Sequence, residues 1–376
     1  MKGKVIAYCK KETVQVIAGV LALLSCFLVP PSAAYLEYVN FNVLILLFCL
    51  MSVVAGMQQI GVFDVLCSWL LHKVHSLRGL MVLLCGLSFF LSMFLTNDVT
   101  LVTVVPFTIM VFGATASGAL MRILLLETLA ANLGSMLTPF GNPQNLFLYA
   151  TYGFALREFL ALMAPYTILS LILLLLTSII WGKGVHPVHH AKKETSERNM
   201  KMDNRKLVIY ILLFGLSVLS VARLLDARIL LVLTLVVIGG VDWHLFGKVD
   251  YALLLTFLFF FVFVGNMGQV QSVRDFFANS LEGREVLIAV LASQIISNVP
   301  TAVLLAQFTD VGKELVIGTN LGGLGTLIAS MASLITYKFY AKLSGSDKGK
   351  YLLWFTAVNV VFLLVLITFS FVYGTR

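Results

Sequence analysis

The chain has 376 residues, of which 60% are hydrophobic and only 12% are charged, and its mean hydropathy is +0.98. A soluble protein carries about 25% charged residues, so we exclude a soluble enzyme, a nucleic-acid-binding domain and a disordered chain. The net charge of +8 resides in loops between long apolar blocks, which is typical of membrane anchoring. We therefore predict an all-α polytopic protein of the cell (inner or plasma) membrane, surrounded by lipid and without a nucleic-acid partner.

Apolar blocks of about the 20 residues that cross a hydrocarbon core follow one another along the chain. The first, 14–30, follows four lysines and is interpreted as a span rather than a leader peptide. Two pairs of blocks, 79–95 with 101–115 and 285–297 with 303–312, are joined by short polar tips and are interpreted as re-entrant hairpins. About nine full spans remain: 14–30, 41–60, 121–153, 158–181, 207–223, 228–246, 252–268, 314–337 and 351–373.

The distribution of Lys and Arg predicts how these spans are oriented. Basic residues lie both before and after the first hairpin, at Lys73, Arg78 and Arg122, so the hairpin enters and leaves on one side. With the N-terminus in the cytoplasm, the inside segments hold 19 of the 26 Lys and Arg and the outside segments hold 7. This bias is the one that the positive-inside rule requires.

The two halves of the chain contain similar motifs. Asn132-Leu133-Gly134-Ser135-Met136-Leu137-Thr138 matches Asn320-Leu321-Gly322-Gly323-Leu324-Gly325-Thr326 at an offset of 188 residues. The same register pairs Asn142 with Ser330 and Asn145 with Ser333, and the hairpin tips pair Asn97 with Asn298. We predict two repeats of inverted topology. The predicted units are a first repeat 1–181 (hairpin 79–115, broken helix 121–153), a cytoplasmic basic linker 182–206 and a second repeat 207–376 (hairpin 285–312, broken helix 314–337).

Inverted repeats with broken helices are the architecture of secondary transporters, whose sites lie where the breaks meet. The alternative is that Gly and Asn only allow close packing of spans, which would explain one break but not four paired ones. Neutral side chains at the breaks both donate and accept hydrogen bonds, although any single one could instead be a cap or turn residue. The predicted substrate-binding residues are Asn97, Thr100, Asn142, Asn145, Ser297, Asn298, Thr301, Ser330 and Ser333.

Two acidic residues lie near the predicted breaks. Asp98 is at the first tip, where a carboxylate is costly unless it is paired, solvated or protonated, and this indicates a function. The alternative is that Asp98 caps the second arm of the hairpin. Glu127 is either a second coupling carboxylate or the charge partner of Arg122 in a structural role.

These motifs resemble the ion transporter superfamily, which includes divalent anion/sodium symporters, citrate carriers, arsenite permeases and a sodium/proton antiporter branch. The resemblance rests on Thr96-Asn97-Asp98-Val99-Thr100, Ser297-Asn298-Val299-Pro300-Thr301 and 138–145, and it covers most of the chain from about residue 40. It implies a homodimer in which a scaffold stays fixed and a transport domain moves as an elevator. It also implies that tip and break residues contact the substrate and a coupling Na+ or H+, with sodium at the hairpin tips. The predicted coupling residues are Asp98, Asn97, Thr138, Gly141, Asn298, Thr326 and Glu127.

The tips also differ from part of that superfamily. Dicarboxylate carriers have Ser-Asn-Thr at both tips, whereas Asp98 and Val299 occupy the third positions here. The motifs are closest to those of arsenite-permease-like anion permeases. The leading hypothesis is a cation- or proton-coupled secondary transporter of a small anion or oxyanion, of the dicarboxylate, citrate or arsenite class. The alternative is a sodium/proton antiporter. A membrane-embedded enzyme is a remote alternative because HExxH and GxSxG are absent, and no catalytic residue or further cofactor is expected.

Overall fold

The structure is a computed structural model that describes residues 12–71, 76–112, 118–182 and 203–374. All secondary-structure elements in these ranges are helices. In the first half they are α2 (Thr13–Ser25), α3 (Tyr35–Tyr38), α4 (Phe41–Gln59), α5 (Val62–Leu71), α6 (Leu77–Ser92), α7 (Asn97–Phe112), α8 (Gly118–Ser135), α9 (Pro143–Thr151) and α10 (Leu156–Trp181). Most of the predicted linker 182–206 and the end of the predicted hairpin 79–115 lie outside the described residues.

The second half contains long, short and interrupted helices in a similar order. Its elements are α12 (Asn204–Val221), α13 (Ala227–Asp242), the 3-10 helix η1 (Trp243–Lys248), α14 (Tyr251–Gln269), α15 (Gln271–Leu281), α16 (Glu285–Ile296), α17 (Asn298–Leu305), α18 (Gly312–Leu321), α19 (Met331–Tyr340) and α20 (Lys348–Gly374). Helices α5 and α15 each follow a long helix directly, α5 across Gly61, whose φ of 74° ends α4 without the steric cost that a side chain would add.

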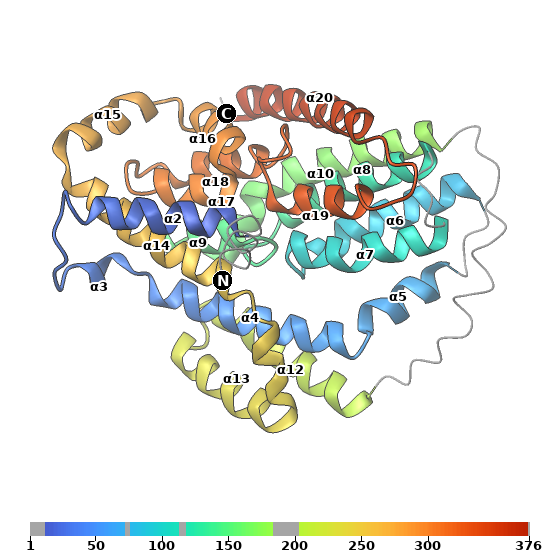
Figure 1. The fold of residues 1–376 in the computed structure, drawn as a ribbon, viewed down its shortest axis with the longest axis horizontal. Coiled ribbons are helices and arrows are strands. Elements are labelled where there is room, and N and C mark those ends of the chain that lie inside the picture. Colours follow the sequence, from blue (N-terminus) through green and yellow to red (C-terminus); the bar gives the residue numbers. More distant parts are fainter. Residues whose placement is uncertain (1–11, 72–75, 113–117, 183–202, 375–376) are drawn as a thin grey trace.

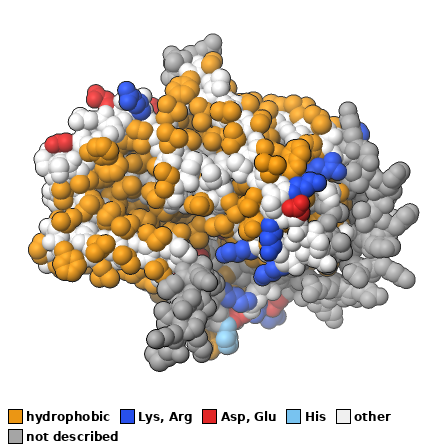
Figure 2. Space-filling view, turned by 45° about the horizontal axis from the view of Figure 1, so that its top comes forward, with side chains coloured by type: hydrophobic (Ala, Val, Ile, Leu, Met, Phe, Trp, Pro, Cys, Tyr) orange, Lys and Arg blue, Asp and Glu red, His pale blue; other side chains and the backbone are white. Residues whose placement is uncertain are grey.

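Six of the described helices are long and apolar enough to cross a membrane, and these are α4, α10, α12, α13 with η1, α14 and α20. Hydrophobic side chains cover much of the face in Figure 2, while Lys and Arg gather on one side of it. The protein is therefore an all-α polytopic membrane protein, as its composition predicts. The count of nine spans, the inverted repeat and the domain boundaries remain predictions.

The helices form two groups that meet along few contacts. One group contains α6 to α10 and α16 to α20, in which α6 packs on α8, α16 on α18 and α19 on both α7 and α8. The other contains α2, α3, α4, α12, α13 and α14, in which α2 packs on α14 and α4 on α12 and α13. The groups touch mainly where α9 meets α4 and where α17 meets α14. In Figure 1, helices of the second half lie among helices of the first half within the larger group.

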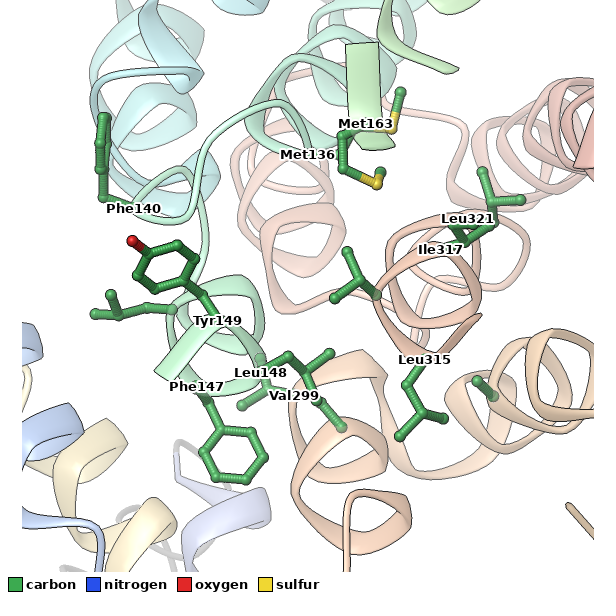
Figure 3. Packing of buried hydrophobic residues seen from close by; sticks show 14 of the residues in the cluster. Met136, Phe140, Phe147, Leu148, Tyr149, Met163, Val299, Leu315, Ile317 and Leu321 are labelled. Carbon is green, nitrogen blue, oxygen red and sulfur yellow. The ribbon is translucent and has the colours of Figure 1, made fainter. Parts of the chain in front are cut away.

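The core between α9, α17 and α18 consists of large aliphatic side chains. Leu148, Val299 and Leu315 are at most 8% exposed, and they pack with Met136 and Ile317 (Figure 3). Close packing of this kind aligns the helices of both halves side by side.

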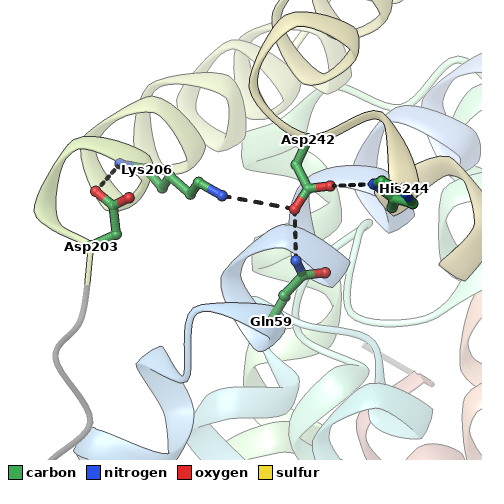
Figure 4. A network of polar contacts seen from close by, with 5 residues as sticks. All are labelled: Gln59, Asp203, Lys206, Asp242 and His244. Atoms are coloured by element: carbon green, nitrogen blue, oxygen red, sulfur yellow. Dashed lines mark hydrogen bonds and ion pairs between the residues drawn. The ribbon is translucent and has the colours of Figure 1, made fainter.

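A polar network ties together three helix ends of the smaller group. Asp242, at the end of α13, accepts a 2.7 Å hydrogen bond from Gln59 at the end of α4 and lies 3.8 Å from Lys206 at the start of α12 (Figure 4). Its other oxygen lies 3.4 Å from His244 Nδ1. The network fixes these helix ends relative to one another.

Candidate functional site

Four interruptions of the helices meet at the centre of the larger group. The hairpin tips are 96–100, where the chain enters the first turn of α7 after α6, and 297–301, where it enters the first turn of α17 after α16. The helix breaks are 136–142, between α8 and α9, and 322–330, between α18 and α19. Each tip donates a main-chain hydrogen bond to a break in its own half: Asn97 N to Gly141 O at 3.1 Å, and Asn298 N to Ala329 O at 3.0 Å.

The second tip turns more sharply than the first. Ser297 alone separates α16 from α17, and its φ of 72° lies in the left-handed region that side chains rarely adopt. Its hydroxyl donates to Ala329 O at 3.3 Å, and its carbonyl accepts from the Thr301 hydroxyl at 2.8 Å. These bonds hold a strained residue beside the second break.

Asn132, in the last turns of α8, joins the first tip to the second break. Its Oδ1 accepts hydrogen bonds from Asn97 Nδ2 at 2.9 Å and from Ser330 Oγ at 3.0 Å. Its Nδ2 donates to Ser333 Oγ at 3.4 Å. Asn132 is 7% exposed, so these partners replace solvent.

Asn320, near the end of α18, makes the reciprocal contacts with the first break. Its Nδ2 donates to Asn145 Oδ1 at 2.6 Å and to Val316 O at 2.7 Å. Its Oδ1 accepts from Asn142 Nδ2 at 3.2 Å. Asn132 and Asn320 are 188 residues apart, as are Asn142 and Ser330, and each asparagine therefore bonds to the break of the opposite half in the same register.

We call these residues the central amide cluster; its members are Asn97, Asn132, Ser135, Asn142, Asn145, Asn320, Ser330 and Ser333. Ser135 links its two parts, because its hydroxyl donates to Asn132 O at 2.9 Å and accepts from Asn142 Nδ2 at 3.2 Å. Every hydrogen-bond partner that the described residues offer to these side chains is uncharged. The cluster is therefore a set of neutral donors and acceptors.

The first break keeps its shape through asparagine side chains. Asn142 caps α9 by accepting from Asn145 N at 2.9 Å. Asn145 is fully buried, and its Nδ2 lies 3.2 Å from Thr138 O and 3.3 Å from Met136 O. Main-chain carbonyls freed by the break thus find donors. The cap interpretation of these residues is thus confirmed, and their role as ligands stays a prediction.

The two predicted threonines tie each break to its hairpin. Thr138 Oγ1 donates to Met93 O at 2.6 Å, and Thr326 Oγ1 donates to Gln294 O at 3.3 Å. Gln294 adds a bond from Thr326 N to its Oε1 at 2.9 Å and donates to Gly322 O at 3.0 Å. The carbonyl and hydroxyl oxygens around each tip are the hard ligands that Na+ or another hard cation needs.

Asp98 lies in the first turn of α7 and is half-buried. The cap-type bond at this helix start is made by Thr96, whose Oγ1 accepts from Val99 N at 3.4 Å. The described residues give the Asp98 carboxylate no hydrogen bond or ion pair. The capping alternative is therefore wrong for its side chain, although its charge is favourable near a helix N-terminus.

Glu127 and Thr100 are buried near the cluster without bonding to it. Glu127 accepts from the Thr108 hydroxyl, whereas Arg122 donates to Gly118 O and Trp181 O, so the predicted Glu127–Arg122 pair is not formed. Thr100 Oγ1 has no hydrogen-bond partner among the described residues.

Two cavities lie between the helix groups. A cavity of about 490 Å³ is lined by Asn40 and Phe261 of the smaller group and by Phe147 and Gln307 of the larger one, with Arg228 at its rim. A second cavity of about 20 Å³ lies between the apolar side of α4 and the residues Thr96 and Asn142. The smaller one has room for about one water molecule beside the cluster.

The sequence interpretation missed Asn132, Asn320, Ser135 and Gln294 as site residues. A signal for two of them was present, because Asn132 and Asn320 stand first in the repeated Asn-Leu-Gly motif. No sequence signal pointed to Gln294, because the corresponding position of the first hairpin is occupied by Met93.

The comparisons with known proteins agree with this architecture. The family model described as "Citrate transporter" matches residues 6–310. The chain belongs to this family. Its function is therefore membrane transport, and the family is part of the ion transporter superfamily that the motifs resemble.

Similar proteins carry related names. An uncharacterized transporter of Methanocaldococcus jannaschii is 32% identical over 356 residues, which is 94% of this chain and 95% of the relative. The inner membrane protein YbiR of Escherichia coli is 31% identical over 80% of both chains. A Dictyostelium discoideum transporter named arsB is 34% identical over 115 residues, which is 31% of this chain and 20% of the relative.

Proposed function

We propose that this citrate transporter family member is a secondary active transporter of a small anion or oxyanion, coupled to sodium ions or protons. The observation that carries the proposal is the reciprocal bonding of Asn132 and Asn320 to the break of the opposite half. Broken helices that meet across a repeat form the substrate and ion sites of secondary transporters. The inverted repeat, an inner or plasma membrane location with a cytoplasmic N-terminus, and a homodimeric assembly belong to the same proposal.

An anion is favoured because four helices begin at the cluster. Helices α7, α9, α17 and α19 start at or beside the tips and breaks, and their N-termini carry partial positive charge. Four other helices, α6, α8, α16 and α18, end there, and their free carbonyl groups favour a cation. Both charges can thus be bound without a Lys or Arg side chain at the cluster.

An elevator movement is supported by the two helix groups. The cluster lies wholly in the larger group, and few contacts join this group to the smaller one. Helix α5 contacts α4 of the smaller group and α6 and α7 of the larger, so it can serve as an arm between them. We infer that the larger group carries the substrate past α4 and α14.

A sodium/proton antiporter is the second candidate. It is favoured by Asp98, a half-buried carboxylate at the first tip that lacks a described partner. In that case sodium ions and protons would compete for one site at the first tip, and an added anion would not change the thermal stability.

Thermal unfolding of the detergent-purified protein tests the proposal. Citrate, succinate, sulfate, arsenate and arsenite would each be added with and without sodium, at two pH values. A ligand at 100 times its Kd stabilises the folded state by about 2.7 kcal/mol. Stabilisation by one anion, dependent on sodium or pH, supports the anion transporter. Stabilisation by sodium or pH alone favours the antiporter.

A further inference from the structure

Glu127 is a buried carboxyl group without a counter-charge. It lies in the middle of α8 and is 0% exposed. Its Oε1 accepts a hydrogen bond from Thr108 of α7, and its Oε2 has no hydrogen-bond partner among the described residues. Burial of an unpaired polar group costs free energy, so this arrangement would be selected against if Glu127 served only packing.

The corresponding positions in the second half show that packing does not need polar groups here. The register that pairs Asn132 with Asn320 pairs Glu127 with Leu315 and Thr128 with Val316. Leu315 and Val316 are fully buried, and Figure 3 shows Leu315 among hydrophobic side chains. Thr336, which bonds to Thr128 at 2.9 Å, corresponds to the buried Leu148. The buried polar group of Glu127, Thr128 and Thr336 therefore has no polar counterpart at the positions that correspond to it.

Buried hydroxyl groups lie between Glu127 and the central amide cluster. Asn97, Thr100 and Thr108 share one face of α7, because their spacings of 3, 8 and 11 residues bring them to similar angles around the helix. Asn97 bonds to Asn132 of the cluster and Thr108 bonds to Glu127. Thr100 is fully buried between them, and its hydroxyl has no described partner.

Among the described residues, no helix packed against α8 supplies an ion-pair partner to Glu127. From α6 comes the buried thiol of Cys85, 3.9 Å from Leu126 O. From α20 and α19 come Tyr351 and Tyr340, whose stacked ring centroids are 4.6 Å apart. From α7 comes Thr108, with Asp98 at the opposite end of the helix, and α10 has its charged residues Arg157 and Glu158 at its distant start. Arg122, on α8 itself, donates to main-chain carbonyls.

We propose that Glu127 is a proton-binding site of the transport cycle, separate from the central amide cluster and joined to it along the α7–α8 interface. The carboxyl group takes up one proton and later releases it, with no redox change. This inference rests on the proposed function, since it names a carrier for the coupling proton. Glu127 would then take up the coupling proton, and Asp98 would remain the candidate for a coupling cation at the first tip.

Proteoliposomes containing citrate and a pH-sensitive dye test the inference. In the wild type, we expect citrate exchange across the membrane and proton movement during net citrate flux. Glu127→Gln should keep exchange within about twofold and lose the linked proton movement. The control Glu158→Gln removes an exposed carboxylate paired with Lys313 at 3.1 Å and should behave as the wild type. Linked proton movement in Glu127→Gln, or loss of exchange in that variant with unchanged thermal stability, would overturn the inference.

An infrared measurement keeps the test independent of the substrate and of how the variant folds. The difference spectrum of the wild type between acid and alkaline pH should contain a carboxylic acid C=O band. Thr108→Val removes the hydroxyl that bonds to Glu127 and should shift this band, whereas Thr177→Val on α10, which removes a hydroxyl bonded to Leu173 O at 2.8 Å, should not. A spectrum unaffected by Thr108→Val contradicts the inference even if citrate is not the substrate. Absence of wild-type exchange of citrate, succinate, sulfate, arsenate and arsenite alike, with the band present, contradicts only the proposed function.

Discussion

The side-chain nitrogen of Asn320 lies 2.6 Å from the side-chain oxygen of Asn145, and this bond joins the broken helix of the second half to that of the first. Both residues are buried, Asn145 completely. The bond crosses the interface at which we propose that the substrate binds.

Asn320→Ala should therefore abolish transport and destabilise the protein by about 1–3 kcal/mol, because it leaves the buried Oδ1 of Asn145 without its donor and removes one of the two acceptors of Asn142 Nδ2. Asn359→Ala is a matched control. Asn359 is also buried and also donates to the carbonyl four residues earlier, at 2.8 Å, but it lies on α20 outside the cluster. Uptake into proteoliposomes and thermal unfolding check both variants. Equal transport loss in the two would show that the cluster has no special role.

Asp98→Asn should abolish coupled flux while the protein remains folded. The substitution keeps the size of the side chain and removes the charge that a coupling cation or proton would meet at the first tip. Asp226→Asn is the control, because Asp226 caps α13 by accepting from Arg228 N at 2.7 Å and Asn caps equally well. Uptake driven by a sodium or pH gradient is the measurement. Wild-type uptake by Asp98→Asn would remove this residue from the mechanism.

Gly134→Ala should destabilise the larger helix group. A Cβ at Gly134 would clash with the Phe89 carbonyl oxygen, where α8 packs against α6. Overpacking of this kind costs about 1–3 kcal/mol. Gly86→Ala on α6 is the control, since nothing lies within 4 Å of its added Cβ. Thermal unfolding in detergent compares the two, and a Gly134→Ala midpoint at or above that of Gly86→Ala would contradict the packing argument.

Thr138→Val should weaken the dependence on sodium. The Thr138 hydroxyl orients Met93 O beside the first tip through a 2.6 Å bond, and a lost neutral hydrogen bond is worth about 1 kcal/mol. That corresponds to about a fivefold rise in the sodium concentration required for half-maximal effect. Sodium titrations followed by thermal unfolding measure the change. An unchanged midpoint in Thr138→Val would place the cation elsewhere.

The sequence was informative where a local pattern fixes a local structure. Long apolar blocks predicted the membrane-spanning helices, and helices α4, α10, α12 and α14 lie within two or three residues of the predicted ranges. The tips at Asn97 and Asn298 and the interruptions before Pro143 and Met331 were also predicted, because Gly, Pro and Asn prevent a helix from continuing.

The sequence was less informative about which side chains contact one another. It suggested Arg122 for Glu127, whereas the structure places Thr108 there. It considered Asp98 as a cap, whereas Thr96 accepts the capping bond. It placed Arg223 at a span end as an interface anchor, without its contacts: Arg223 donates to Gly153 O at 3.1 Å and lies over the Tyr149 ring. Each of these contacts depends on which helix faces which.

The sequence by itself determined that the chain spans a membrane, that four polar interruptions divide its apolar helices, and which neutral residues occupy them. These properties follow from transfer free energies and from backbone preferences, which depend on the residue and its neighbours. Only the tertiary structure decided that Asn132 reaches Ser330 and that Asn320 reaches Asn145. Contacts across about 180 residues depend on how the helices pack, and packing is a property of all side chains at once.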